Sequence, residues 1–118
     1  DQIMESSAKL RNLKSSPRKA RLVVDTIRGQ EVEKALNILK FTRRAQAKYV
    51  EKLLLSAISN WENKNKGERA EDANLYVKEI FVDQGRVLKR WQPAPRGSAH
   101  PIRKPYSHIT VVVDKKNA

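Results

Sequence analysis

The chain has 118 residues, among which 25 Lys and Arg outnumber 13 Asp and Glu to give a formal net charge of +12. This length fits one domain with a modest core. The charge exceeds the magnitude of about 2–8 that solubility requires, so it indicates nucleic acid, or alternatively an anionic membrane or an acidic protein. The absence of cysteine excludes disulfides and thiolate sites, and the sequence shows neither a membrane-spanning apolar run nor the features of a signal peptide, so a soluble intracellular protein is expected.

A short strand and a helix are predicted first. Residues 8–13 alternate weakly between polar and apolar side chains, which is typical of a strand. Ser16 fits an N-cap and Pro17 fits the first helical position, where its missing N–H costs nothing. Gly29 is expected to end this helix. The apolar positions of the helix recur at helical spacing: Ala20, Val23, Val24 and Ile27.

Two further helices are predicted over residues 31–40 and 43–62, the second after Thr42 as a cap. Glu31 and Glu33 suit the positive end of the first helix dipole. The apolar stripe of the first is Val32, Ala35, Leu36 and Leu39. The stripe of the second, which we expect to be the hydrophobic spine of the domain, is Ala47, Val50, Leu53, Leu54, Ala57, Ile58 and Trp61.

The pattern then changes from helix to strand. After a polar turn over residues 63–72, residues 75–83 and 108–114 are rich in alternating β-branched and aromatic residues. The order of elements predicts an α+β fold, with three helices packed on a small antiparallel sheet and a long protruding β-hairpin.

We expect a single domain over residues 1–118. Its globular part spans residues 8–83 and 108–114, an extended basic arm spans residues 84–107, and short flexible tails lie at both ends. So long a connection is rare in a compact domain unless it is functional or disordered. It contains no acidic residue and four of the five prolines, which favour extended backbone.

Cations in this arm would neutralise phosphates, and its aromatic residues would stack on unpaired bases. A disordered basic linker is the alternative. The candidate RNA-binding residues here are Arg86, Lys89, Arg90, Trp91, Arg96, His100, Arg103, Lys104 and Tyr106, with His108 at the following strand, where a structural role competes.

A second acid-free window covers residues 6–24, and a smaller basic group begins the third helix. Phosphates contact both cationic side chains and helix N-termini. Solvated helix faces are the ordinary alternative. The candidate RNA-binding residues of the globular part are Lys9, Arg11, Lys14, Ser16, Arg18, Lys19, Arg21, Arg28, Arg43, Arg44 and Lys48.

No catalytic or metal-binding constellation is found. His100 and His108 match no metal-ligand spacing, and no Gly-rich phosphate loop occurs. Glu68, Glu71 and Asp72 are expected to be a solvated acidic cluster in a turn. We therefore expect no enzyme activity, cofactor or metal; the alternative is a small hydrolase that uses His108 or the acidic turn.

A sequence-specific DNA-binding regulator is the other alternative. The second and third helices would then form a helix-turn-helix around Phe41 and Thr42. Against it, the joint has no glycine, and the third helix is apolar along most of its length.

Seven ordered motifs resemble one known family. They are residues 16–23 (SPRKARLV), 27–29 (IRG), 35–39 (ALNIL), 54–58 (LLSAI), 80–83 (IFVD), 88–90 (LKR) and 107–113 (SHITVVV). Together they resemble family twenty-two of the bacterial large-subunit ribosomal proteins, from about Ala8 to Asp114. The family's common hairpin tip has basic residues where Ala94 and Ser98 stand, and often Arg where Pro101 and Pro105 stand.

The resemblance implies a structural role in the large ribosomal subunit, and a cytoplasmic location that leaves an organellar ribosome open. It implies binding to large-subunit (23S-type) rRNA, contacts with neighbouring ribosomal proteins, no membrane and no homo-oligomer. The arm is expected to line the exit tunnel and meet the nascent peptide. The tunnel-facing tip would be Pro93, Ala94, Pro95, Arg96, Gly97, Ser98 and Ala99.

Overall fold

The computed structural model describes residues 5–66, 68–93 and 99–115, excluding the side chains of residues 71–72 and 86–104. The elements in chain order are β1 (Ser6–Leu13), α1 (Pro17–Val24), α2 (Val32–Phe41), α3 (Gln46–Lys64), α4 (Ala70–Ala73), β2 (Leu75–Pro93) and β3 (Ala99–Lys115).

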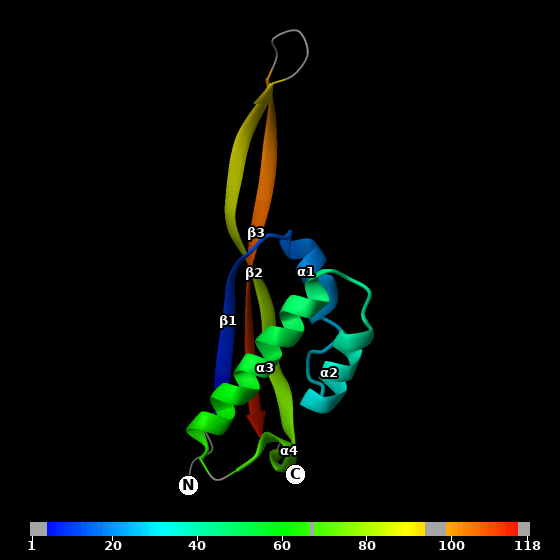
Figure 1. Cartoon of the computed structure of the whole chain (residues 1–118), viewed down its shortest axis with the longest axis vertical. Coiled ribbons are helices and arrows are strands. Elements are labelled where there is room, and N and C mark those ends of the chain that lie inside the picture. The colour runs from blue at the N-terminus through cyan, green and yellow to red at the C-terminus, as the bar shows by residue number, and fades with distance from the viewer. Residues whose placement is uncertain (1–4, 67, 94–98, 116–118) are drawn as a thin grey trace.

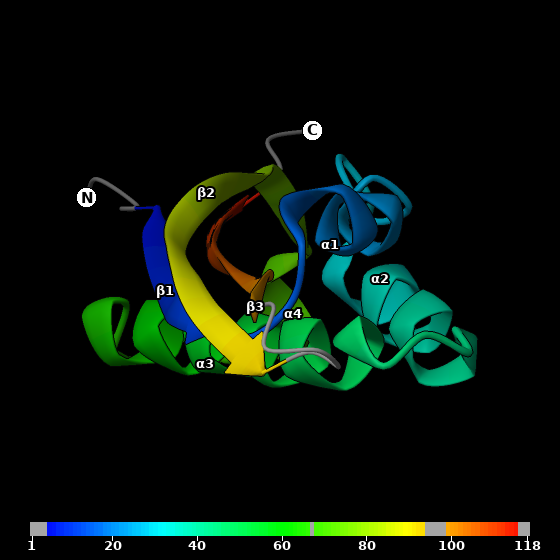
Figure 2. The ribbon, with the colours of Figure 1, turned by 90° about the horizontal axis from the view of Figure 1, so that it is seen from above.

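One antiparallel sheet carries the fold, in the strand order β1–β3–β2. Its middle strand is therefore the last in sequence. Figure 1 shows the three longer helices beside the sheet, and Figure 2 shows α3 along one face with α1 and α2 to one side. This architecture confirms the predicted α+β class, with three helices packed on an antiparallel sheet.

α1 begins where the sequence predicts. The Ser16 hydroxyl accepts a hydrogen bond from the Lys19 N–H at 3.3 Å, and Pro17 lies in the first turn. All four residues of the predicted stripe are buried, which confirms the face that meets the core: Ala20, Val23, Val24 and Ile27.

The prediction that Gly29 ends this helix is wrong, because α1 ends at Val24. The chain tightens there: the Thr26 N–H donates to the Val23 carbonyl, three residues back, and the Thr26 hydroxyl donates to the same carbonyl at 2.6 Å. Gly29 does take a left-handed φ of 78°. It does so in the connection to α2, where its N–H donates to the Val77 carbonyl at 3.0 Å.

The prediction that Thr42 caps the third helix is also wrong. Its hydroxyl donates to the Ile38 carbonyl at 2.6 Å and its N–H donates to the Leu39 carbonyl at 3.2 Å, so it terminates α2 instead. α3 begins only at Gln46, after Ala45, and no side chain caps it. Its spine is confirmed, since every residue of the predicted stripe except Ile58 is fully or almost fully buried.

Residues 63–72 are predicted as a polar turn, but they include the start of α4, a single helical turn. A Glu62 carboxylate oxygen accepts a hydrogen bond from the Ala70 N–H at 3.0 Å, which satisfies a donor at the start of α4. Asn74 then takes a left-handed φ of 52° and directs the chain into β2. A tertiary contact to α3 thus orders a turn that the local sequence pattern does not reveal.

The core lies between the helices and one face of the sheet. Among the described side chains, Trp61 on α3 is the largest that is fully buried. In the globular part, strand residues alternate between faces, so the buried apolar positions of β2 and β3 meet the helices. The register shift between Val77 and Glu79 places Val77 and Ile80 on the same buried face. The buried sheet residues in this layer include Val77, Ile80, Val82, Ile109, Val111 and Val113.

The predicted strands at residues 75–83 and 108–114 are confirmed, but each is part of a much longer strand. β2 has 19 residues and β3 has 17, and their pairing runs from Leu75 opposite Lys115 to Pro93 opposite Ala99. The pairing of β1 with β3 ends at Leu13 opposite Ser107. Beyond that point β2 and β3 continue as a two-stranded ribbon, which we call the arm.

The arm makes the molecule elongated. Its extents are 68 × 26 × 17 Å and its radius of gyration is 17.8 Å, whereas a compact chain of this length has a radius of about 13.5 Å. The arm thus projects away from the globular part, as Figure 1 shows.

Two neighbouring leucines of α3 test the position of the core. Leu54 is fully buried and Leu55 is 47% exposed. Leu54→Ala should lower the free energy of unfolding by about 2–5 kcal/mol, because it removes buried contacts and leaves a cavity. Leu55→Ala should change it by about 0.5 kcal/mol or less. Urea denaturation of both variants measures the difference, and equal losses would contradict the assigned buried face.

Candidate nucleic-acid interface

The root of the arm is held where β1 ends. Ser107 is fully buried, and its hydroxyl donates to the Ser15 carbonyl at 2.6 Å. One residue further, the His108 Nδ1 accepts a hydrogen bond from the Asn12 N–H at 3.0 Å. Asn12 has a left-handed φ of 59° and lies in an irregularity of the β1–β3 pairing. These contacts give His108 a structural role, and they attach the arm to the body.

β2 approaches the same point closely. A Cβ on Gly85 would lie 3.1 Å from both the His108 Nε2 and the Tyr106 carbonyl oxygen. The β2–β3 register shifts between Gln84 and Val87, as a β-bulge does. Glycine therefore allows β2 to pass the imidazole ring at the position where the strands leave the body.

Exposed cations surround this root. Gln46 at the start of α3 donates its Nε2 hydrogen to the Ser15 hydroxyl at 2.9 Å, so the starts of α1 and α3 lie together. Figure 1 shows both helix starts near the departing arm. Six cations at these two starts are exposed, and we call them the basic collar: Lys14, Arg18, Lys19, Arg43, Arg44 and Lys48.

The charge of the collar is not neutralised within the protein. Among the described residues, no collar cation lies within ion-pair distance of a carboxylate. At the opposite end of the molecule, by contrast, Lys78 pairs with Glu5 at 2.6 Å and Lys115 pairs with Glu68 at 3.3 Å. The hydrogen bond to Glu5 raises the pKa of Lys78. Within the described part of the chain, exposed cations without a carboxylate partner, such as Lys64 and Lys66, also occur at that opposite end, so the collar is distinguished by holding six unpaired cations together.

Arg21 and Arg28, both candidates from the sequence, are already engaged by the sheet. The Arg21 guanidinium donates to the Val82 carbonyl at 2.9 Å, and the Arg28 guanidinium donates twice to the Ile80 carbonyl, at 3.2 and 2.8 Å. Arg28 also pairs with Asp25 at 2.7 Å. These contacts cover the outer edge of β2, which otherwise is a template for pairing with another chain.

Lys9 and Arg11 lie exposed on β1. Lys9 borders a hollow of about 500 Å³ between β1 and α3, which also meets Tyr49, Lys52 and Asn60. Sequence reasoning missed Lys52 and Tyr49, although both occupy polar positions between the apolar residues of α3. It also missed Lys40 at the end of α2, which borders a second hollow with Arg43, Arg44 and Lys48.

Most of the arm's candidate side chains lie outside the described residues. The backbone register pairs Lys89 with Arg103, Leu88 with Lys104 and Arg90 with Ile102. Trp91 and His100 are placed by the same pairing, whereas the tip prediction for residues 94–98 falls outside the described part of the chain. Tyr106 is described and is half-buried at the root.

Neither a metal cluster nor a membrane span occurs in the described part of the chain. It holds no group of three or more His, Asp or Glu side chains able to bind a metal ion. No helix in it is long and apolar enough to cross a membrane.

Comparison with known proteins gives one consistent result. The model of the family "Ribosomal protein L22p/L17e" matches residues 8–114. The large ribosomal subunit protein uL22 of Flavobacterium johnsoniae is 56% identical over 110 residues, which cover 93% of this chain and 80% of the relative. The uL22 proteins of Christiangramia forsetii and Bacteroides fragilis are each 54% identical over 110 residues, covering 93% of this chain and 82% and 80% of the relatives.

Exchange of two collar lysines tests the interface. Lys14→Gln with Lys19→Gln should weaken binding to a structured RNA and flatten its salt dependence. The slope of log binding constant against log salt should fall by about 0.7–0.9 for each phosphate that the variant no longer neutralises. The matched control is Lys64→Gln with Lys66→Gln, which removes the same charge from exposed residues at the far end of α3. Equal changes in the two variants would mean that only net charge matters.

Proposed function

The chain belongs to the ribosomal protein L22p/L17e family, and from this membership we propose that it is a structural constituent of the large ribosomal subunit, held by rRNA at the basic collar and along the arm. No reaction, cofactor or metal is part of this proposal. Because its relatives are bacterial, we place it in cytoplasmic ribosomes.

The arm is the observation that carries the proposal. Its two strands pair only with each other beyond Leu13. Figure 1 shows no helix beside the outer part of the ribbon, so among the described residues no further layer of this protein covers its faces there. An isolated two-stranded hairpin is marginally stable in water. Folded RNA supplies what is missing, because it can enclose a ribbon on both sides and attract its cations through phosphates.

The composition of the arm agrees with an RNA environment. Cations occur at successive positions, such as Lys89 and Arg90 on β2 and Arg103 and Lys104 on β3. Successive positions in a strand belong to opposite faces, so both faces of the ribbon carry positive positions. A protein partner on one side would leave the cations of the other face without anionic partners, whereas RNA on both sides can neutralise the cations of both faces.

The collar and the arm act together in this proposal. The hydrogen bonds of Ser107 and His108 to the end of β1 attach the arm to the body that carries the collar. RNA that binds the collar therefore also fixes the orientation of the arm relative to the RNA. The tip, residues 93–99, would reach the wall of the peptide exit tunnel and contact the nascent chain. We further propose that neighbouring ribosomal proteins are partners and that the chain does not form a homo-oligomer.

The DNA-binding alternative finds no support in the fold. A recognition helix needs an exposed face of base-reading side chains. α3 instead lies along the sheet as the core spine, with Val50, Leu54, Ala57 and Trp61 fully buried. The family membership likewise points to the ribosome.

Shortening the arm tests the function. Lys89 pairs with Arg103, so replacing residues 90–102 by Asn-Gly leaves a paired residue on each side of a two-residue turn, which can close the shortened strands. Cells that depend on this variant should accumulate incomplete large subunits, because the rRNA loses its internal protein contacts. Gradient profiles of subunits and quantification of the bound variant measure the effect.

A second variant separates the effect of the arm's length from the effect of its charge. Substitution of Arg90, Arg96 and Arg103 by Gln keeps the length of the arm and removes part of its charge. It should assemble better than the shortened variant but bind with a weaker salt dependence. Normal subunits and normal growth with the shortened arm would refute the role of the arm.

A further inference from the structure

One large apolar side chain stands in the middle of positive charge. Phe41, the last residue of α2, is 78% exposed and is the most exposed large hydrophobic residue in the described part of the chain. At about 100° per residue, it lies roughly 200° around the helix from Leu39, which faces the core. Its direction is therefore set by the helix, and the ring contributes little to the core.

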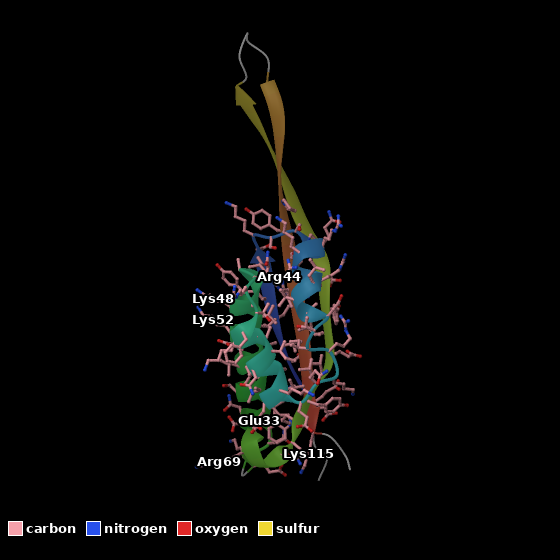
Figure 3. All side chains as sticks on the ribbon, turned by 90° about the vertical axis from the view of Figure 1, so that its right-hand side faces the viewer. Glu33, Arg44, Lys48, Lys52, Arg69 and Lys115 are labelled. Atoms are coloured by element: carbon pink, nitrogen blue, oxygen red, sulfur yellow. The ribbon has the colours of Figure 1, made fainter. Side chains whose placement is uncertain are left out.

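A lone exposed apolar residue is ordinary on a protein surface, so the surroundings decide its meaning. The chain on either side of Phe41 borders a hollow of about 410 Å³ between α2 and α3. Four cations line this hollow, Lys40, Arg43, Arg44 and Lys48, and all four are exposed. Figure 3 shows Arg44 nearest the arm, with Lys48 and Lys52 following along α3.

The hollow has one carboxylate against four cations. None of the four is ion-paired among the described residues, and Glu51 is the one carboxylate that lines the hollow. The first turn of α3 also has no acidic residue and no capping side chain, so its positive end adds to the field. The electrostatics of this junction fit an anionic ligand.

We propose that this junction binds an unpaired nucleotide of the RNA, with the base stacked on the Phe41 ring and the adjoining phosphates on Lys40, Arg43, Arg44 and Lys48. Phe41 follows Lys40 directly and precedes Arg43 and Arg44 by two and three residues, so at about 3.8 Å per residue its Cα lies within about 12 Å of the Cα atoms of all three cations. This inference rests on the proposed function, because it names the kind of RNA element that the body of the protein recognises.

The pairing of an aromatic ring with cations favours this ligand over two others. Bases inside a duplex are stacked on each other and offer no free face, whereas an unpaired base stacks readily on an aromatic side chain. A protein-docking surface has a core depleted of charge, but here the single ring has cations on both sides in sequence. A looped-out or single-stranded nucleotide can use both the aromatic ring, through its base, and the cations, through its phosphates.

Exchange of the ring tests the proposal in full-length protein bound to purified large-subunit RNA. Phe41→Ala should weaken binding by about tenfold, since removal of one base stack has effects of this order. Phe41→Trp should retain the affinity within about twofold, and Phe41→Leu should behave like the alanine variant because it lacks a π face. The salt dependence should stay unchanged in all three, because no charge is removed. Folding is not at risk, since the ring is exposed.

Phe81→Ala is the matched control. Phe81 is also exposed, at 43%, and alternates with the buried Ile80 and Val82, so it faces away from the helices. It should bind RNA as the unchanged protein does. An equal reduction of affinity in this variant would overturn a specific site at Phe41.

Chemical probing of unpaired bases gives the second readout. The wild-type complex should protect one or two unpaired bases that regain reactivity in the saturated Phe41→Ala complex. Unchanged affinity and unchanged reactivity would overturn the nucleotide site while leaving the ribosomal role intact. If the Phe41→Ala variant keeps its affinity and base reactivity but its assembled subunits lack a neighbouring protein, Phe41 contacts that protein instead. Absence of any salt-dependent binding by the wild type would refute the proposed function itself.

Discussion

The structure depends on one constraint: β2 and β3 each belong to two different environments. Their inner halves form the middle and one edge of a sheet that the helices cover, and their outer halves form a ribbon with no other layer. The buried contacts of the inner halves stabilise the strand pair, and the register continues outward from them. The ribbon is thus an extension of the core, but its own surface must be covered by something outside the chain.

The contacts at the root and the distribution of charge follow from this constraint. Ser107 and His108 fasten β3 to the end of β1, and Gly85 lets β2 pass close beside them. Around this point six exposed cations lie together without a carboxylate partner among the described residues, whereas two of the cations at the far end, Lys78 and Lys115, have such partners. The molecule therefore presents one end to a polyanion, with the arm ahead of the collar.

Sequence patterns predicted the elements better than their ends. The stripes of α1 and α3 were identified because burial of one helix face imposes a period on many residues. The predicted end of α1 at Gly29 and the predicted start of α3 at Thr42 were wrong. Local hydrogen bonds of the Thr26 and Thr42 side chains instead accompany the observed ends of α1 and α2. The arm was predicted from its lack of acidic residues, its prolines and its flanking strands.

The candidate site was predicted less completely, for a different reason. The engagement of Arg21 and Arg28 with β2 joins residues 61 and 52 positions apart, and a single sequence does not display such contacts. Lys40 and Phe41 were missed because neither belongs to a run of cations. The α2–α3 connection brings Lys40 to the same hollow as Arg43, Arg44 and Lys48, and the sequence alone does not display this arrangement.

The most direct measurement is sedimentation of a cell lysate through a gradient, followed by a high-salt wash of the subunit peaks and detection of this protein in each fraction. If rRNA encloses the arm as well as neutralising the collar, the protein stays with the large subunit after the wash. Release at moderate salt would show a peripheral protein held by counterion release alone. Absence from the large-subunit peak would contradict the account altogether.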